Sequence, residues 1–423
     1  MNTRQTTHIL RKNRLRIVSL FIGISCIALH VGYAQQTIRI DGKEITISEG
    51  VTKEMIAEIK KVSADGTDYS ITLQRIKSND DIAKICIAFP NVKALTIRAE
   101  KEISSIESVA KLKSIINFQL HGSSVTDYSP ISGLTNLTLL YLSCPVGPDL
   151  KWLSRLTKLN TLTIYGSDDL FGSTRLVSFE GIPDMPSLGS IKISNAAPAS
   201  LEPLQALRFV TSLELHYSEI ADLSPLTGMP SLEKLSLYGS TVRDFSPLSG
   251  CKKLKEVNFY ATKNADYTTF GKVIQLEVLK GGLTELKDIS WITNLTNLKV
   301  YHAFAEGIED FTPLAKLKLE ELKLWNMKSK NIDLSFLSGI PTLKKLILES
   351  LENASKINNL QSLTNLESLT INKFNTKGGE AIPLDIIKKL PNLTNFFVTR
   401  DLFTKEQLNG FANPSIKING QTP

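Results

Sequence analysis

The sequence contains few of the residues that build disulfide frameworks, metal centres or catalytic sites. Four cysteines, five histidines and three tryptophans occur in 423 residues, and none has a metal-ligand or catalytic spacing. The chain lacks His-Glu-x-x-His, Gly-x-Ser-x-Gly, a phosphate loop and the dinucleotide glycine set. These absences argue against a disulfide-stapled domain and against the common metallo- and nucleotide-dependent enzymes. We therefore expect no enzyme activity and no cofactor, and we interpret the widely spaced cysteines as buried thiols.

The first 34 residues have the pattern of a secretory signal peptide. Five basic residues lie between Arg4 and Arg16, an apolar stretch covers Ile17–Val31, and small residues at 32 and 34 precede Gln35. This order predicts cleavage after Ala34 and a secreted, periplasmic or cell-surface protein. A lipoprotein cut at Cys26 is the less favoured alternative, because the apolar stretch continues past it. No later apolar stretch is long enough to span a membrane.

The charge of the chain depends on this leader. The sequence has 49 basic and 42 acidic residues, and the leader holds five of the basic ones and none of the acidic ones. The expected mature chain therefore has 44 against 42, a net charge of +2. Nucleic-acid binding needs a basic stripe on the folded domain, so we expect no nucleic-acid partner.

A repeat of about 22 residues dominates the rest of the chain. Its frame is Leu-x-x-Leu-x-Leu, as in Leu232-Glu-Lys-Leu235-Ser-Leu237. Alternating apolar residues indicate a short strand, and stacked copies would bury a continuous ladder. One longer step predicts a bulge near Ser167–Arg175. Fourteen units follow, whose middle apolar residues are Leu95, Phe118, Leu140, Leu162, Ile191, Leu213, Leu235, Val257, Leu279, Tyr301, Leu322, Leu346, Leu369 and Phe396.

The segments between the strands share the motif Asp-x-Ser/Thr-Pro-Leu. Its clearest copies begin at Asp127, Asp222, Asp244 and Asp310. A hydroxyl residue followed by proline suits the N-cap and first position of a helical turn, because the hydroxyl accepts an orphan N–H and proline has none to satisfy. We therefore expect short helical or 3₁₀ turns on the convex side.

The period, the strand frame and the return motif resemble the internalin-type leucine-rich repeats of bacterial surface proteins, over about residues 80–400. The resemblance implies an α/β solenoid, a horseshoe with a parallel concave sheet, and contact with partner proteins. One departure concerns the asparagine that usually follows the strand, since Ser123, Ser167, Ser218, Ser240 and Thr262 stand there. A hydroxyl can still bond the turn backbone, although it has fewer bonding groups than an amide.

Both ends of the solenoid are expected to carry caps that hide its open edges. Residues 35–79 form the N-terminal cap, with a hairpin around Asp41-Gly42 and a helix whose apolar stripe is Val51, Met55, Ile59 and Val62. The repeats follow over residues 80–400. Residues 401–423 form the C-terminal cap, where Thr404-Lys-Glu-Gln407 matches a capping box.

Outward strand positions supply the candidate binding residues. The position after the last apolar residue of each unit reads Arg98, His121, Ser143, Tyr165, Ser194, His216, Tyr238, Tyr260, Gly282, Phe304 and Trp325. This register makes Gly281 and Ala303 inward residues and places His302 outward between Tyr301 and Ala303. Tyr238, Tyr260, Phe304 and Trp325 would form an aromatic row roughly 19 Å long. We expect ligand contact at these four and at Tyr165, His216 and His302, unless the row only packs as scaffold.

These observations favour a binding module, monomeric, that holds a protein or a glycan on its concave face. Two alternatives stay open: a structural spacer in the periplasm without a specific ligand, and an enzyme with an unrecognised site. The three histidines after the leader, His121, His216 and His302, lie four repeats apart, too far to share a metal, and solvent-facing positions are expected for them.

Overall fold

The computed structural model describes residues 27–31, 36–63, 69–143, 150–166, 178–195, 197–198, 200–260, 265–282, 286–327, 332–351, 354–372, 384–399 and 416–419. The chain divides into two compact units, Met1–Leu176 with Glu180–Leu188, and Val177–Phe179 with Gly189–Pro423. The expected cleavage site at Ala34, the bulge near Ser167–Arg175 and the capping box at Thr404–Gln407 lie outside the described residues.

The first unit starts with antiparallel strands and continues as a parallel ladder. Strands β1, β2 and β3 pair antiparallel, and β3 to β8 pair parallel in chain order. The strands are β1 (Ile27–Val31), β2 (Gln36–Asp41), β3 (Glu44–Ser48), β4 (Ser70–Ile76), β5 (Ala94–Ala99), β6 (Asn117–His121), β7 (Leu139–Ser143) and β8 (Thr161–Tyr165). The helices are α1 (Lys53–Val62), α2 (Asn79–Ala88), and the 3₁₀ turns η1 (Glu107–Lys111), η2 (Ser129–Gly133) and η3 (Lys151–Arg155).

The hairpin of β2 and β3 turns at Asp41-Gly42, where Gly42 has a φ of 58°. Helix α1 buries Met55 and Ile59 as expected, but Val62 is 40% exposed, so its place in the buried stripe is wrong. It is the last residue of the helix. The parallel ladder begins at β3 and includes β4, and helix α2 follows β4. The sequence patterns indicated neither β4 nor α2.

The second unit is a parallel ladder from β9 to β21. Its strands are β9 (Ser190–Ser194), β10 (Ser212–His216), β11 (Lys234–Ser236), β12 (Glu256–Asn258), β13 (Val278–Gly282), β14 (Val300–Phe304), β15 (Glu321–Trp325), β17 (Lys345–Glu349), β19 (Ser368–Asn372), β20 (Asn395–Val398) and β21 (Lys417–Ile418), with β16 (Ile332–Asp333) and β18 (Ala354–Ser355) paired separately. The helices are η4 (Glu202–Ala206), η5 (Ser224–Gly228), η6 (Ser246–Gly250), η7 (Tyr267–Lys272), η8 (Ser290–Asn294), η9 (Thr312–Lys316), η10 (Leu334–Gly339), η11 (Ile357–Ser362) and α3 (Leu384–Lys388).

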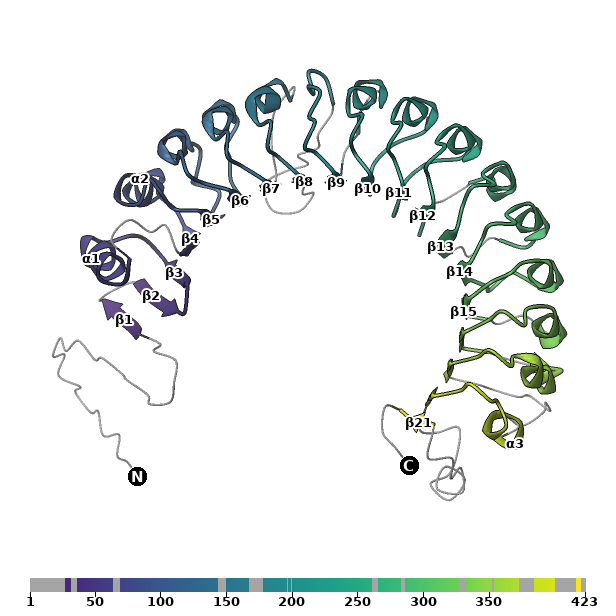
Figure 1. Ribbon diagram of the computed structural model, residues 1–423. Coiled ribbons are helices and arrows are strands. Elements are labelled where there is room, and N and C mark those ends of the chain that lie inside the picture. The colour runs from purple at the N-terminus through teal and green to yellow at the C-terminus, as the bar shows by residue number, and fades with distance from the viewer. Residues whose placement is uncertain are drawn as a thin grey trace, which may run out of the picture. The chain divides into compact units, whose positions relative to one another are not determined.

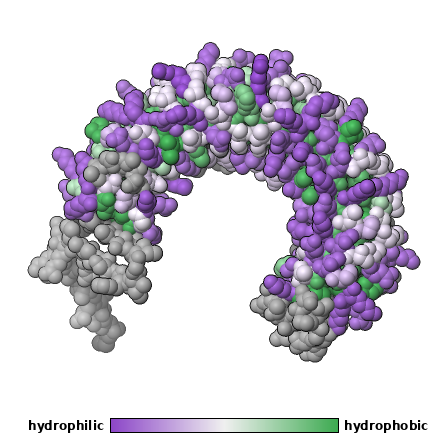
Figure 2. Space-filling model, in the orientation of Figure 1, coloured by the Kyte–Doolittle hydropathy of each residue, from purple (hydrophilic) through white to green (hydrophobic). Residues whose placement is uncertain are grey.

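Strand pairing confirms the predicted repeat frame in each unit. Leu95, Phe118, Leu140 and Leu162 are register partners in the first unit. The second unit pairs the remaining middle residues one after another, from Ile191 to Phe396. All fourteen are buried, while Figure 2 shows mostly hydrophilic residues on the visible surface. Within each unit the strands line one side of the coil and the helical turns the other (Figure 1). Each unit is therefore a leucine-rich-repeat solenoid.

The Asp-x-Ser/Thr-Pro-Leu segments form 3₁₀ turns as expected, but aspartate caps them and not the hydroxyl residue. Asp222 Oδ1 accepts the Ser224 N–H at 2.8 Å, and Asp244 Oδ1 accepts that of Ser246 at 2.7 Å. The serine or threonine is the first residue of the turn, and the N-cap residue makes no side-chain bond. The aspartate reaches this N–H because it lies two residues earlier. The same bond occurs at Asp127, Asp288 and Asp310. In η7 and η10 the aspartate, Asp266 or Asp333, is itself the N-cap residue and accepts the N–H two residues later.

The inward glycine of β13 leaves no gap, because the previous repeat fills it. Gly281 is buried and pairs with Ala303, as the register predicted. A Cβ at Gly281 would lie 2.1 Å from Cζ of Phe259, so the phenyl ring occupies the space that a leucine takes in other repeats. Protein interiors pack at the density of organic crystals. Here the large Phe259 of one repeat compensates for the missing side chain of Gly281 in the next.

The serines at the usual asparagine position differ from one another. Ser218 Oγ donates to the His216 carbonyl at 2.9 Å, as expected for a hydroxyl that bonds the turn. Ser123 and Ser240 are 2% exposed, and their Oγ atoms have no hydrogen-bond partner among the described residues. The expectation of a turn bond is wrong for these two, because a hydroxyl reaches less far than the amide it replaces.

Candidate functional site

Outward side chains on the strands of the second unit form three columns across the repeats. We name them by strand position. The first column contains Lys234, Glu256, Val278, Val300, Glu321 and Lys345. The central column contains Lys192, Glu214, Ser236, Asn258, Lys280, His302 and Lys323. The last column contains Ser194, His216, Tyr238, Tyr260, Gly282, Phe304 and Trp325. We call the surface made by the three columns the sheet face.

The aromatic residues of the last column form a set of touching rings, which we call the aromatic cluster. Ring centroids lie 6.3 Å apart for Tyr238 and Tyr260, 5.8 Å for Tyr260 and Trp325, and 6.3 Å for Phe304 and Trp325. The sequence indicated a row along the strands that is interrupted at Gly282. Instead, Tyr260 and Trp325 meet although they stand three strand steps apart, about 14 Å along the ladder. Gly282 has no side chain between them, so their rings can lean together.

The local backbone and exposure of the cluster also depart from the simple strand pattern. Strands β11 and β12 end at Ser236 and Asn258, so Tyr238 and Tyr260 belong to the turns that follow. Tyr238 is 37% exposed, while Tyr260, Phe304 and Trp325 are half-buried. Burial raises the pKa of the Tyr260 phenol. The rings therefore pack against each other and still present apolar surface, with hydroxyl groups at the tyrosines.

His216 and His302 join this site in different ways, and Tyr165 does not join it. The His216 ring lies 6.1 Å from that of Tyr238, and its Nε2 is 2.8 Å from Ser236 Oγ. His302 lies in the central column with Nε2 2.8 Å from Glu321 Oε1. Tyr165, 40% exposed, belongs to the first unit. Four of the seven proposed residues thus form the cluster, and two stand beside it.

The histidines are less exposed than the sequence suggested. The side chains of His216 and His302 are 19% and 15% exposed, and His121 stacks on Tyr141 with a centroid distance of 4.3 Å. Burial lowers the pKa of all three below its usual value. For His302, Lys280 and Lys323 lower the pKa further, and these effects outweigh the opposing bond to Glu321. The solvent-facing assignment is therefore corrected: neighbouring repeats cover much of each ring.

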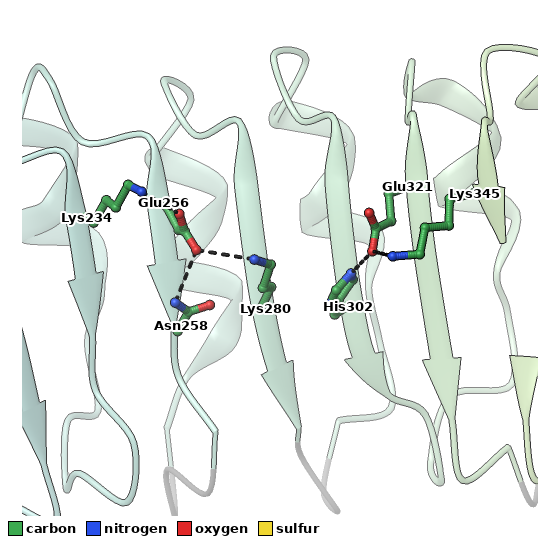
Figure 3. A network of polar contacts seen from close by, with 7 residues as sticks. All are labelled: Lys234, Glu256, Asn258, Lys280, His302, Glu321 and Lys345. Carbon is green, nitrogen blue, oxygen red and sulfur yellow. Dashed lines mark hydrogen bonds and ion pairs between the residues drawn. The ribbon is translucent and has the colours of Figure 1, made fainter. Parts of the chain in front are cut away.

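Two carboxylates of the first column organise the charges beside the cluster. Figure 3 shows Glu256 between Lys234 and Lys280, at 3.8 and 3.3 Å. It also shows Glu321 between His302 and Lys345, with Lys345 Nζ at 3.1 Å. Burial raises the pKa of Glu321, but its bonds to Lys345 and His302 outweigh burial and the net change is downward. The lysine contacts are shared, partly exposed ion pairs, which individually stabilise the fold little.

Tyr217 is the site residue that the sequence analysis missed. It is 52% exposed, has a φ of 48°, and meets the Tyr238 ring at 5.1 Å in an edge-on arrangement. The backbone at the same repeat position also has a positive φ in Asn195, Gly239, Asn326 and Ser350. A bulky tyrosine is rare in this conformation, whereas asparagine and glycine tolerate it. The signal in the sequence was a tyrosine directly after His216, at the place where other repeats carry asparagine or glycine.

Other kinds of site have less support among the described residues. Cys86 and Cys251 are buried, as expected, and burial raises the pKa of their thiols to about 12 and about 11. Cys144 lies outside the described residues. Within the described ranges no three His, Cys, Asp or Glu side chains gather as a metal site would require. No helix in the described part of the chain combines the length and apolarity needed to cross a membrane.

The ladder, the 3₁₀ turns and the sheet face define an internalin-like leucine-rich-repeat fold. An internalin from Listeria monocytogenes strain 4b F2365 is similar, with a TM-score of 0.55 and 22% identity over 81% of this chain and 94% of that one. A leucine-rich-repeat protein of Leptospira interrogans has a TM-score of 0.53 and 16% identity, covering 88% and 99%. These identities are low, so the likeness concerns the fold.

A third similar structure is the Drosophila Toll–Spätzle complex. Its matched chain has a TM-score of 0.60 and 13% identity over 90% of this chain, which spans 57% of that chain's length. No protein-family model matches the sequence, and no curated protein sequence matches it.

Proposed function

We propose that this chain is a secreted or cell-envelope protein that binds a protein partner through the sheet face of its second unit. The observation that carries the proposal is the aromatic cluster of Tyr238, Tyr260, Phe304 and Trp325, whose rings touch and remain partly exposed. Aromatic side chains provide large contact area with few rotors to freeze, and such residues dominate binding hot spots.

The fold and the leader support this proposal by different routes. A solenoid offers a long surface built from one residue of every repeat, so partners can be held without a deep pocket. The Toll structure contains its partner Spätzle, which is an example of a similar fold in a protein complex. The basic and apolar pattern before Ala34 supports export. N-terminal sequencing of the exported protein should give Gln35 first, and a lipid-modified start at Cys26 would contradict cleavage after Ala34.

The binding proposal is tested with variants that distinguish residues contacting the partner from residues that only stabilise the fold. Proteins captured by the exported chain are identified, and the Kd of the purified partner is measured for Tyr260→Ala and Trp325→Ala. Hot-spot residues lose about 2 kcal/mol or more on truncation, which is roughly a thirtyfold weaker Kd. Phe209→Ala is the matched control, because Phe209 is 49% exposed and lies outside the aromatic cluster.

The outcomes distinguish the alternatives. Weaker binding with a melting temperature close to wild type supports the proposal. A collapse of the melting temperature in Tyr260→Ala would assign the cluster to the scaffold. Equal effects of Phe209→Ala would place the binding surface elsewhere. Capture of an oligosaccharide in place of a protein would favour the glycan alternative, because a sugar ring also stacks on aromatic faces.

A further inference from the structure

We propose that the partner presents an acidic peptide segment to the sheet face, with an apolar or aromatic side chain on the aromatic cluster and a carboxylate between Lys280 and Lys323. This inference rests on the proposed function of the cluster and adds the chemistry of what it binds.

The central column beside the cluster carries two lysines. Its strands β12 to β15 carry Asn258, Lys280, His302 and Lys323 in the central column, in register and without a carboxylate. Lys280 and Lys323 flank His302 two strand steps apart, about 10 Å at the backbone, so their long side chains can reach one anion from both sides. Burial is the main cause that lowers the pKa of His302, which favours its uncharged form. The two lysines therefore supply the positive charge.

The carboxylate that contacts Lys280 stands in the first column, away from the rings, whereas the one that contacts Lys323 is Glu349, in register with Trp325. Glu256 and Glu321 lie in the first column, two residues before the central column on their strands. Glu256 contacts Lys280 at 3.3 Å and is shared with Lys234 (Figure 3). An ammonium has three N–H donors, and this contact uses one. On β15 the order is Glu321, Lys323 and Trp325. An incoming anion beside the cluster meets the Lys280 ammonium directly, and at Lys323 it competes with the 3.7 Å contact to Glu349.

Lys323 ties the cation column to the rings. Its Nζ lies 5.2 Å from the centroid of Trp325 and 3.7 Å from Glu349. Its side chain is 30% exposed, and that of Lys280 is 31% exposed. A cation over a tryptophan face and a long ion pair are both weak contacts at an exposed site. The ammonium can therefore turn to a ligand carboxylate at small loss.

The spacing of the columns favours a peptide over an anionic glycan. Central and last columns are two residues apart on each strand, about 6.8 Å, and alternate side chains of an extended peptide have the same spacing. A peptide with an acidic residue two positions from an aromatic one can therefore satisfy both columns. A uronic-acid polymer offers carboxylates and ring faces but no side chain that enters a ring cluster.

The experiment pans a phage-displayed random dodecapeptide library against the full chain after removal of its leader. Selected peptides should be enriched in Asp or Glu within two positions of an aromatic or large apolar residue. Their synthetic versions are titrated against Lys280→Gln/Lys323→Gln. Loss of two charge-assisted contacts should weaken the Kd by about tenfold or more, and wild-type binding should weaken with added salt.

A matched control removes the same charge elsewhere on the same network. Lys234→Gln/Lys345→Gln also loses two cations that contact Glu256 and Glu321, but in the first column, away from the rings. Its Kd should stay within about threefold of wild type, since rim charges contribute little. Equal losses in both double variants would overturn the proposal, because they would reflect overall charge.

Two further outcomes separate this inference from the binding proposal. Selected peptides that are neutral or basic, but lose binding in Tyr260→Ala, would overturn the acidic segment and keep the aromatic cluster as binding site. Peptides insensitive to Tyr260→Ala would overturn both. If no peptide is selected, and polygalacturonate binds wild type but not Lys280→Gln/Lys323→Gln, the anion is a glycan and the peptide assignment fails.

Discussion

Gly281 and Phe259 share one space in the core, and this gives a sharp stability prediction for Gly281→Ala. A Cβ at Gly281 would lie 2.1 Å from Cζ of Phe259 and 2.4 Å from both Cε atoms. The Phe259 ring is 3% exposed and packs against Phe245, Tyr267 and Phe270, with centroids 5.9, 5.7 and 4.9 Å away. It cannot yield to a new methyl group without moving these rings.

The magnitude follows from the crowding. Overfilling a packed core costs about 1–3 kcal/mol of unfolding free energy. The backbone of Gly281 does not have a positive φ, so alanine would otherwise be tolerated there. Phe259→Leu replaces the blocking ring by a smaller side chain that lacks the Cζ and Cε atoms. The double variant Phe259→Leu/Gly281→Ala should therefore lose about 1 kcal/mol less than the sum of the two single variants.

Urea unfolding followed by circular dichroism measures these differences. Gly133→Ala is the matched control, because the nearest neighbour of a Cβ there is the flexible end of Lys113 at 3.8 Å. The control should change the unfolding free energy little. The packing argument is refuted if Gly281→Ala is as stable as Gly133→Ala, or if the effects of Phe259→Leu and Gly281→Ala simply add.

Three further predictions concern the ladder, the histidines and the strained tyrosine. Leu235→Asp should lower the melting temperature strongly, because Leu235 is 1% exposed and a buried carboxylate costs several kcal/mol. Lys234→Asp should change the melting temperature little, because Lys234 is exposed. Equal losses in the two variants would disprove the register. Burial lowers the pKa of His216 and His302 in the folded chain, whereas histidine in the unfolded chain has a pKa of about 6.5. The unfolded chain therefore binds more protons as the pH falls, and the unfolding free energy should decrease from about pH 7.5 to 5.5. His216→Gln/His302→Gln should flatten this fall, and an unchanged slope would contradict the assignment. Tyr217→Asn should keep or raise the unfolding free energy, since the left-handed conformation costs about 1–2 kcal/mol, and a clear decrease would show that ring packing outweighs it.

The repeat fold could be predicted because its determinants are local and occur many times. Each strand repeats the same alternation, so an error in one unit is corrected by its neighbours, and all fourteen middle residues are buried register partners. The cap of the return turn was assigned to the wrong side chain, since Ser224 and Asp222 both suit a cap and only the backbone shows which one reaches the N–H. Strand β4 was missed because it lies before the regular frame begins.

The candidate site could be predicted only in part. The register placed Phe304 and Trp325 side by side, as the structure does. It could not foresee that Tyr260 and Trp325 meet across Gly282, because contact between rings depends on side-chain direction and empty space, not on strand spacing. Tyr217 escaped notice because its importance lies in a backbone conformation that no spacing rule reports.

The sequence by itself determined the repeat, its register and which residues face inward, because burial of one apolar ladder permits a single alternation. It also determined that Gly281 had to be an inward residue, although glycine is a poor one. Only the tertiary structure decided how that space is filled, which of two polar residues caps each turn, and which outward rings and charges meet. These outcomes depend on packing between repeats, where a side chain of one unit occupies volume or offers a partner that belongs to the next.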